Sequence, residues 1–101
     1  MIIRLVCYDI RDDRCRSRIF DKLESFGFLS IQKSVFCGIH SPDQWNNCAA
    51  SLKWILEKYG NPEEDKIFAV VISKNCAKNV FSIGIKTDIH SLLREEKLTW
   101  I

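Results

Sequence analysis

The stretch VCYDIRDDRCRSRIF, residues 6–20, decides how the chain is interpreted, because an apolar run ends in it on a carboxylate. The run stops at Asp9, and two further acids follow at Asp12 and Asp13. Three arginines then stand at alternate positions: Arg14, Arg16 and Arg18. A carboxylate at a strand end is a poor core residue and a good ligand for a hard cation. This stretch is therefore the first candidate for a functional site.

The composition describes a folded protein with no strong charge bias. A length of 101 residues allows one domain, and 47% hydrophobic with 28% charged residues argues against disorder. The net charge of +2 is shared by both halves, so any nucleic-acid site must be a local patch. The five cysteines lack C-x-x-C spacing, which favours free thiols in a reducing cytoplasm over disulfides or zinc. We expect neither an N-terminal signal nor a membrane span, because the apolar runs are too short.

Residues 2–9, IIRLVCYD, predict a strand that is buried on both faces. β-Branched and aromatic residues are frequent in this segment, as they are in strands. Apolar side chains fall on both alternations: Ile3, Leu5 and Cys7 on one face, and Ile2, Val6 and Tyr8 on the other. A strand washed by solvent on one side would instead alternate with polar residues.

The rest of the chain predicts two helices and further strands. A helix is expected over 12–26, with Asp12 or Asp13 as its N-cap and Gly27 as its stop. Residues 28–40 indicate two short strands or one bent strand. A second helix follows, in which Ser41, Pro42 and Gln44 form a capping-box start and Gly60 is the end. We then expect a strand over 66–73, a loop over 74–79 and a short extra strand over 80–86.

This order is that of an α+β, ferredoxin-like βαββαβ domain, an antiparallel sheet with both helices on one face and a short extra C-terminal strand. We place the domain at 1–86 and leave 87–101 as a tail. Two helices cover only one face of such a sheet, although the strands are apolar on both. The other face therefore predicts a second copy of the chain, in a face-to-face homodimer.

The acids and arginines leave two interpretations open. One Asp9 cannot supply the roughly six oxygens that magnesium requires, whereas a twofold axis would bring two copies together. The alternative is that Asp9 pairs with Arg16 and caps the turn. Arg16 falls inside the apolar arc of the first helix, where a buried cation needs an anionic partner. Arg14 and Arg18 lie outside that arc, on a solvated face or against an anion. An exposed Trp54 would favour a protein partner over stacking on bases.

Two motifs occur in order and carry a resemblance. YDI-x-DD-x-x-R-x-R spans Tyr8 to Arg18, and G-x-x-x-I-Q-x-S-V-F-x-G spans Gly27 to Gly38. Together they are similar to the small CRISPR-associated endonuclease family, the lesser partner of the CRISPR integrase in spacer acquisition. The likeness is close over residues 2–40 and continues as pattern through the strand near residue 70.

The resemblance implies a ferredoxin-like homodimer that hydrolyses RNA or DNA with Mg²⁺ or Mn²⁺ held between the Asp9 residues of two subunits. It implies roles in nuclease activity for the positions of Tyr8, Arg16, Arg18 and Phe36. One departure weakens the expectation of efficient cleavage. Some members carry an arginine where this chain has Ser30.

The same resemblance implies a second role, as a scaffold that bridges integrase dimers on duplex DNA, with the tail 87–101 suited to the integrase contact. Single-stranded RNA and duplex DNA both remain open as partners. The virulence-associated protein D family, which acts as a toxin-like ribonuclease, is a third possibility with the same fold and early aspartate. The double acid and the Q-K-S-V-F segment favour the CRISPR family.

Overall fold

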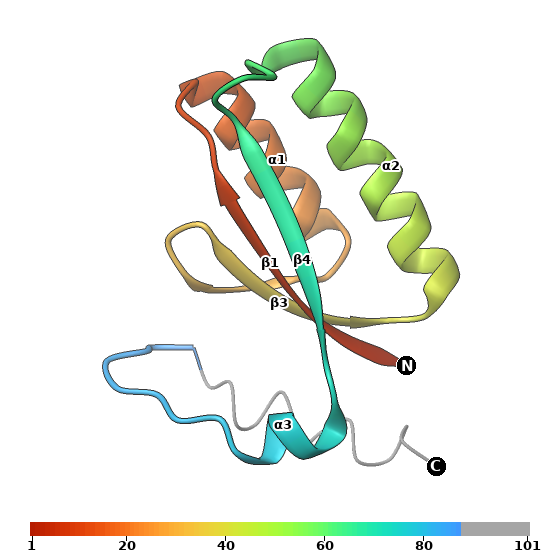
Figure 1. Ribbon diagram of the computed structural model, residues 1–101, viewed down its shortest axis with the longest axis vertical. Coiled ribbons are helices and arrows are strands. Elements are labelled where there is room, and N and C mark those ends of the chain that lie inside the picture. Colours follow the sequence, from red (N-terminus) through yellow and green to blue (C-terminus); the bar gives the residue numbers. More distant parts are fainter. Residues whose placement is uncertain (88–101) are drawn as a thin grey trace.

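The computed structural model describes residues 1–87 of the chain. Its strands are β1 (Ile2–Asp9), β2 (Leu29–Gln32), β3 (Val35–His40) and β4 (Lys66–Ile72), and its longer helices are α1 (Asp13–Ser25) and α2 (Pro42–Tyr59). The strands form one antiparallel sheet in the order β2-β3-β1-β4. Both long helices lie side by side on the same side of this sheet (Figure 1). The predicted ferredoxin-like fold is confirmed.

The helix ends follow the capping residues that the sequence contains. The Asp12 carboxylate accepts a hydrogen bond from the backbone N–H of Cys15 at 2.7 Å, which makes Asp12 the N-cap of α1. Ser41 and Gln44 form the predicted capping box at the start of α2. Gly27 follows α1 with φ +83°, a backbone conformation that glycine adopts without steric cost.

The main core lies between the sheet and the two long helices. Val6 and Phe36 face it from the central strands, while Leu23 of α1 and Leu52 of α2 pack onto them. All four side chains are at most 3% exposed. Removing this apolar surface from water is the largest favourable term that holds the two layers together.

The other face of the sheet has a smaller cluster of its own. Ile3 and Cys37 are fully buried there, because Ala77 and Val80 of the segment after β4 pack against them. The cover is incomplete: Phe68 of the edge strand β4 remains 60% exposed. We call this surface, made by alternate residues of the four strands away from α1 and α2, the open face.

Two predictions for the segment after β4 are wrong. Residues 74–79 were expected to form a loop, but Lys74–Lys78 form a short helix, α3, which Ser73 caps by accepting from the Cys76 N–H at 3.1 Å. The extra strand expected over 80–86 does not form, since the segment passes across the open face instead of pairing at an edge and Gly84 has φ +76°. The predicted tail lies outside the described residues, apart from Thr87.

None of the helices in residues 1–87 combines the length and the apolar character that crossing a bilayer requires.

Candidate functional site

The three acids at the end of β1 have different surroundings. Asp12 is the N-cap of α1, and Asp13 forms an ion pair with Arg16. Asp9 is exposed, and its carboxylate makes no hydrogen bond or ion pair within residues 1–87. Because side chains alternate along a strand and Tyr8 faces the helices, Asp9 lies on the open-face side. Asp9 is therefore the acid that remains available to a ligand.

Arg16 is held by partners other than the one predicted. Its Nη1 donates a hydrogen bond to the carbonyl of Ile10 at 3.1 Å, and its Nη2 contacts the carboxylate of Asp13. The side chain is 36% exposed. The expected burial and the expected pairing with Asp9 are both wrong, because Asp13 stands one helical turn away on the same helix and reaches the guanidinium first.

Tyr8 and Phe36 form the floor beneath Arg16. Their rings are stacked at 6.1 Å between centroids, and Phe20 meets Phe36 edge-on at 5.1 Å. Phe36 is fully buried and contacts no solvent, so its contribution is to fix Tyr8 from below. Burial raises the pKa of the Tyr8 phenol, and the nearby Arg16 opposes that shift. Tyr8 is therefore a neutral hydrogen-bond donor at neutral pH.

These side chains surround a cavity of about 220 Å³, which is lined by Tyr8, Arg16, Ser17, Phe20, Asp21, Lys33 and Ser34. Ser34, whose φ is +69°, turns the chain between β2 and β3, and its carbonyl accepts from the Tyr8 N–H at 3.1 Å. Lys33 and Arg16 supply positive charge to the cavity. Asp9 and this cavity thus sit on either side of the last residues of β1.

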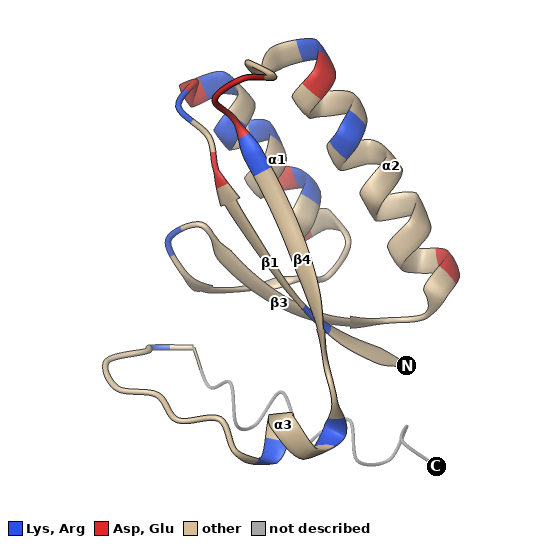
Figure 2. Cartoon of the chain, viewed as in Figure 1, with Lys and Arg blue, Asp and Glu red and all other residues tan. Residues whose placement is uncertain are grey.

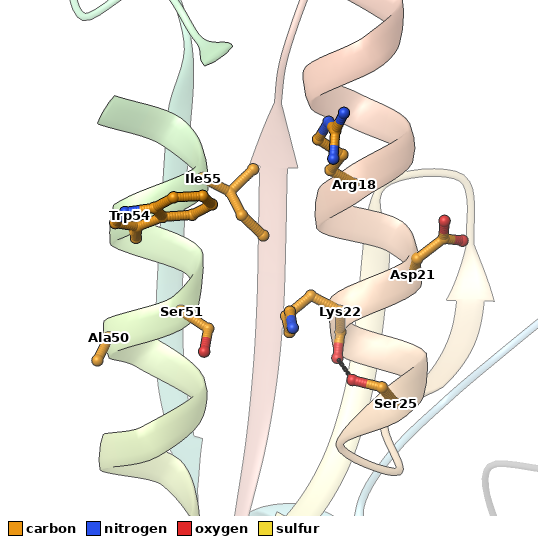
Figure 3. A pocket seen from close by; sticks show the side chains of 8 residues that line it. All are labelled: Arg18, Asp21, Lys22, Ser25, Ala50, Ser51, Trp54 and Ile55. Carbon is orange, nitrogen blue, oxygen red and sulfur yellow. Dashed lines mark hydrogen bonds between the residues drawn. The ribbon is translucent and has the colours of Figure 1, made fainter. Parts of the chain in front are cut away.

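Arg18 is directed elsewhere. Its guanidinium lies over the ring of Tyr59 on α2, 4.1 Å from the ring centroid. It lines a second and larger cavity between α1 and α2, shown in Figure 3, and not the one lined by Tyr8 and Arg16. Of the five residues predicted for nuclease activity, Tyr8, Arg16 and Phe36 lie together on the helix-covered face. Asp9 lies on the opposite face of the same strand end, and Arg18 lines the other cavity.

Asp65 fixes this end of the molecule and was not singled out from the sequence. Its carboxylate accepts from the backbone N–H of Arg11 at 2.9 Å and of Asn61 at 2.7 Å. These two N–H groups hold its pKa below the ordinary value of 3.8. Asp65 thereby ties the loop before β4 to the segment that follows Asp9. The polar turn N-P-E-E-D, in which Asp65 is the last residue, is the sequence signal for it.

Charged residues gather at this end, around the end of β1, the start of α1 and the loop into β4, as Figure 2 shows. No group of three His, Cys, Asp or Glu side chains in residues 1–87 is arranged to hold a metal ion. The end of β1 in one subunit therefore presents the unpaired carboxylate of Asp9 and not a closed metal site. Its oxygen chemistry suits a hard cation, but a second ligand must come from another molecule.

The thiols and the buried histidine have structural surroundings. Burial raises the pKa of Cys37 and of Cys48 to about 11, so both are thiols and not nucleophiles at neutral pH. His40 stacks on Phe28 with 4.4 Å between ring centroids, and its Nε2 contacts the carbonyl of Phe26. The expectation of free cysteines is confirmed.

The fold and site define a ferredoxin-like protein in which Asp9 is the unpaired one of the three acids at the end of β1, with a cationic cavity on the other side of that strand. Residues 1–80 match the family model described as CRISPR associated protein Cas2. The chain belongs to this family. The match also decides against the virulence-associated protein D family.

Named relatives agree with this assignment. CRISPR-associated endoribonuclease Cas2 1 of Archaeoglobus fulgidus is 30% identical over 83 residues, which are 82% of this chain and 84% of the relative. The protein of the same name from Francisella tularensis subsp. novicida is 30% identical over 80 residues, or 79% and 77% of the two chains.

Solved structures share the fold. A chain of a partial Cas6-RT-Cas1–Cas2 complex superposes with a TM-score of 0.71 and 27% identity, covering 82% of this chain and 91% of that chain. Streptococcus pyogenes Cas2 gives a TM-score of 0.65 at 22% identity, with coverage of 81% and 99%. The second likeness speaks for the fold alone.

Proposed function

We propose that this chain is a metal-dependent endonuclease that acts as a homodimer, with Asp9 of each subunit contributing to one divalent-cation site. The observation that carries the proposal is that only two of the three acids at the end of β1 have partners. Asp12 caps α1 and Asp13 holds Arg16, whereas Asp9 has no partner in residues 1–87. It also stands at the edge of an incompletely covered apolar face. A second copy on that face would supply the missing carboxylate.

The open face supports the homodimer. Leu29, Phe68 and Val70 lie on it and are 44%, 60% and 45% exposed. Apolar side chains of this size on adjacent strands favour association, because burying them removes their surface from water. Since Asp9 ends the central strand β1 on the same face, a twofold axis that runs between the two sheets and parallel to them would bring the two carboxylates toward each other.

The chemistry divides between the cation and the side chains. Bound Mg²⁺ or Mn²⁺ would polarise a phosphodiester and lower the pKa of a water nucleophile. Asp9 would hold the cation through its carboxylate oxygens. Arg16 and Lys33 would attract the phosphates on either side of the scissile bond, and the neutral Tyr8 hydroxyl would donate a hydrogen bond to a phosphate oxygen.

RNA is the substrate to test first, because the relatives from Archaeoglobus and Francisella are named endoribonucleases. DNA remains the second substrate, since Arg16 and Lys33 of the cavity would contact phosphates, which RNA and DNA share. Asp9 is exposed, so the proposed cleavage site does not enclose the sugar of the substrate. Contacts to phosphates also carry no base preference.

A scaffold role is the second candidate, and one observation favours it. The solved chain that is 27% identical belongs to a complex with Cas1. We infer that this chain also binds a CRISPR integrase and lies along duplex DNA, held through phosphates by basic side chains. The resemblance implies an arginine at the position of Ser30 in some members of the family, and the uncharged Ser30 fits a binding role better than efficient cleavage.

The test is cleavage of end-labelled single-stranded RNA and duplex DNA with Mg²⁺ at low salt, comparing wild type with Asp9→Asn. We expect wild type to cut at least one substrate and Asp9→Asn to lose activity on the order of 10³-fold, because the cation loses its ligand. Asp43→Asn is the matched control, since Asp43 is an exposed acid in the first turn of α2. It should cut like wild type.

Equal cutting by wild type and Asp9→Asn would exclude the shared-carboxylate site. Cutting by neither, with duplex DNA and integrase still bound by both variants, would assign the function to the scaffold.

A further inference from the structure

A groove runs between α1 and α2 on the surface of the helical layer. Its cavity, which Arg18 lines, has a volume of about 610 Å³ and is larger than the cavity of about 220 Å³ that Tyr8 lines. The lining side chains, drawn in Figure 3, are Arg18, Asp21, Lys22, Ser25, Ala50, Ser51, Trp54 and Ile55. The sheet separates the groove from Asp9, which lies on the open face. The groove is therefore not part of the proposed cleavage site.

The α1 wall of the groove is cationic. Arg18 and Lys22 are one helical turn apart, and neither forms an ion pair within residues 1–87. The Arg18 guanidinium lies over the Tyr59 ring, 4.1 Å from its centroid, and makes no hydrogen bond within residues 1–87, so its N–H groups remain available. Lys22 reaches from α1 toward α2 (Figure 3). Asp21 is the one acid among the lining residues, so the two cations give the groove a net positive charge.

The α2 wall offers an aromatic surface. Trp54 is 56% exposed, and Figure 3 shows its indole at the side of α2 that borders the groove. Tyr59 meets it edge-on at 6.1 Å between centroids, and the Lys58 ammonium lies 4.7 Å from its ring centroid. The indole is thus held in place by its neighbours while much of its area stays open. Ser51 adds a hydroxyl next to it.

We propose that this groove binds single-stranded nucleic acid, with backbone phosphates on Arg18 and Lys22 and a base stacked on Trp54. Cations that track a phosphate backbone beside an exposed aromatic ring are the pattern of proteins that hold single strands. The sequence alone favoured a protein partner for Trp54, because it did not reveal the two cations opposite. An acidic peptide would satisfy the cations, but its Asp and Glu side chains have no aromatic ring to stack on the exposed indole.

The site also accounts for Arg18, which points away from the cavity of Tyr8 and Arg16. A strand held in the groove would lie on the outside of the helices, and a dimer formed through the open face would leave that surface accessible. The binding therefore requires neither hydrolysis at Asp9 nor a metal ion. It provides a second contact for the nucleic acid that the proposed function handles.

The experiment measures binding of a fluorescein-labelled 12-nucleotide oligouridylate by anisotropy, in an Asp9→Asn background without divalent metal. We expect Trp54→Ala to weaken binding about tenfold with an unchanged salt dependence, because it removes stacking and no charge. Lys22→Ala should weaken binding and lower the slope of log K against log salt by about 0.7. Lys53→Ala also removes one positive charge, but from the side of α2 that borders β4 and not the groove. It should change neither the affinity nor the salt dependence.

Intrinsic fluorescence localises the effect, since stacking on Trp54 quenches its emission and Trp54→Phe should remove that quenching. Circular dichroism verifies that each variant is folded. Equal affinity of Trp54→Ala and its parent would overturn the proposal. So would displacement of the oligouridylate by an equal concentration of polyglutamate, which would make an acidic peptide the occupant. Because no cleavage is measured, failure of the nuclease proposal leaves these readouts intact.

Discussion

The two faces of the sheet are built from alternate residues of the same strands, yet the chain covers them to different extents. On the helix-covered face, Val6 and Phe36 lie fully buried beneath α1 and α2. On the open face, Ile3 is fully buried at the centre while Phe68 is 60% exposed at the edge strand. Apolar residues on both alternations therefore predict where burial is favourable, but not which molecule provides the cover.

The largest expected difference between the faces is in stability. Phe36→Ala removes a fully buried ring and leaves a cavity under Tyr8, so it should lower the free energy of unfolding by about 3–5 kcal/mol. Phe68→Ala, at low protein concentration, should lower it by less than about 1 kcal/mol. Urea unfolding followed by circular dichroism measures both. Similar losses would mean that the open face is packed as tightly as the other.

Self-association sharpens the same contrast. Phe68 and Val71 are neighbours on β4 with nearly equal exposure, 60% and 61%, but they lie on opposite faces of the sheet. Phe68→Asp would place a charge in the proposed dimer interface and should weaken dimerisation on the order of 100-fold. Val71→Asp should leave it unchanged. Sedimentation equilibrium distinguishes the two, and the opposite ranking would move the interface to the other face.

The acid stability of the site end depends on Asp65. Its pKa in the folded protein lies below the ordinary value of 3.8, so its contribution is complete above that pH and is lost as the pH falls through the folded value. We expect Asp65→Asn to be less stable than wild type at pH 7 and the difference to shrink below pH about 4. Thermal unfolding between pH 7 and pH 3 tests this. A gap that widens toward low pH would contradict the sign.

The smallest effect is expected at the turn between β2 and β3. Ser34 has φ +69°, which is unfavourable for a residue with a Cβ. Ser34→Gly should therefore raise the free energy of unfolding by about 0.5 kcal/mol, since part of the gain is offset by the freedom of glycine in the unfolded chain. Chemical denaturation of the two proteins side by side measures it, and a loss of stability would show that the hydroxyl contributes more than the relief of strain.

The regular elements were predictable because their signals are local. Asp12, the capping box at Ser41 and the stop at Gly27 each act within one turn of helix, so the sequence contains them whole. The same is true of the strand patterns. Short α3 was missed, since five residues with a serine cap carry little periodicity and its burial depends on Ile3, far away in the chain.

The candidate site was predictable only where partners are close in sequence or carried by the family motif. Tyr8 and Phe36 do stack on each other, while Asp9, the next residue of β1, lies on the opposite face of the sheet. The partner of Arg16 was misassigned because a neighbour in sequence competed with the strand end. The position of Arg18 over Tyr59 could not be foreseen, since it depends on how α1 and α2 pack.

The packing of Ala77 and Val80 against Ile3 and Cys37 has a consequence for a newly synthesised chain. A newly synthesised single molecule buries the centre of its open face with its own Ala77 and Val80. This internal cover reduces the apolar surface through which single molecules would aggregate before they form a dimer. A second copy that binds the open face must pack beside α3 or displace it. The rate of dimerisation therefore depends on how tightly α3 packs on the sheet.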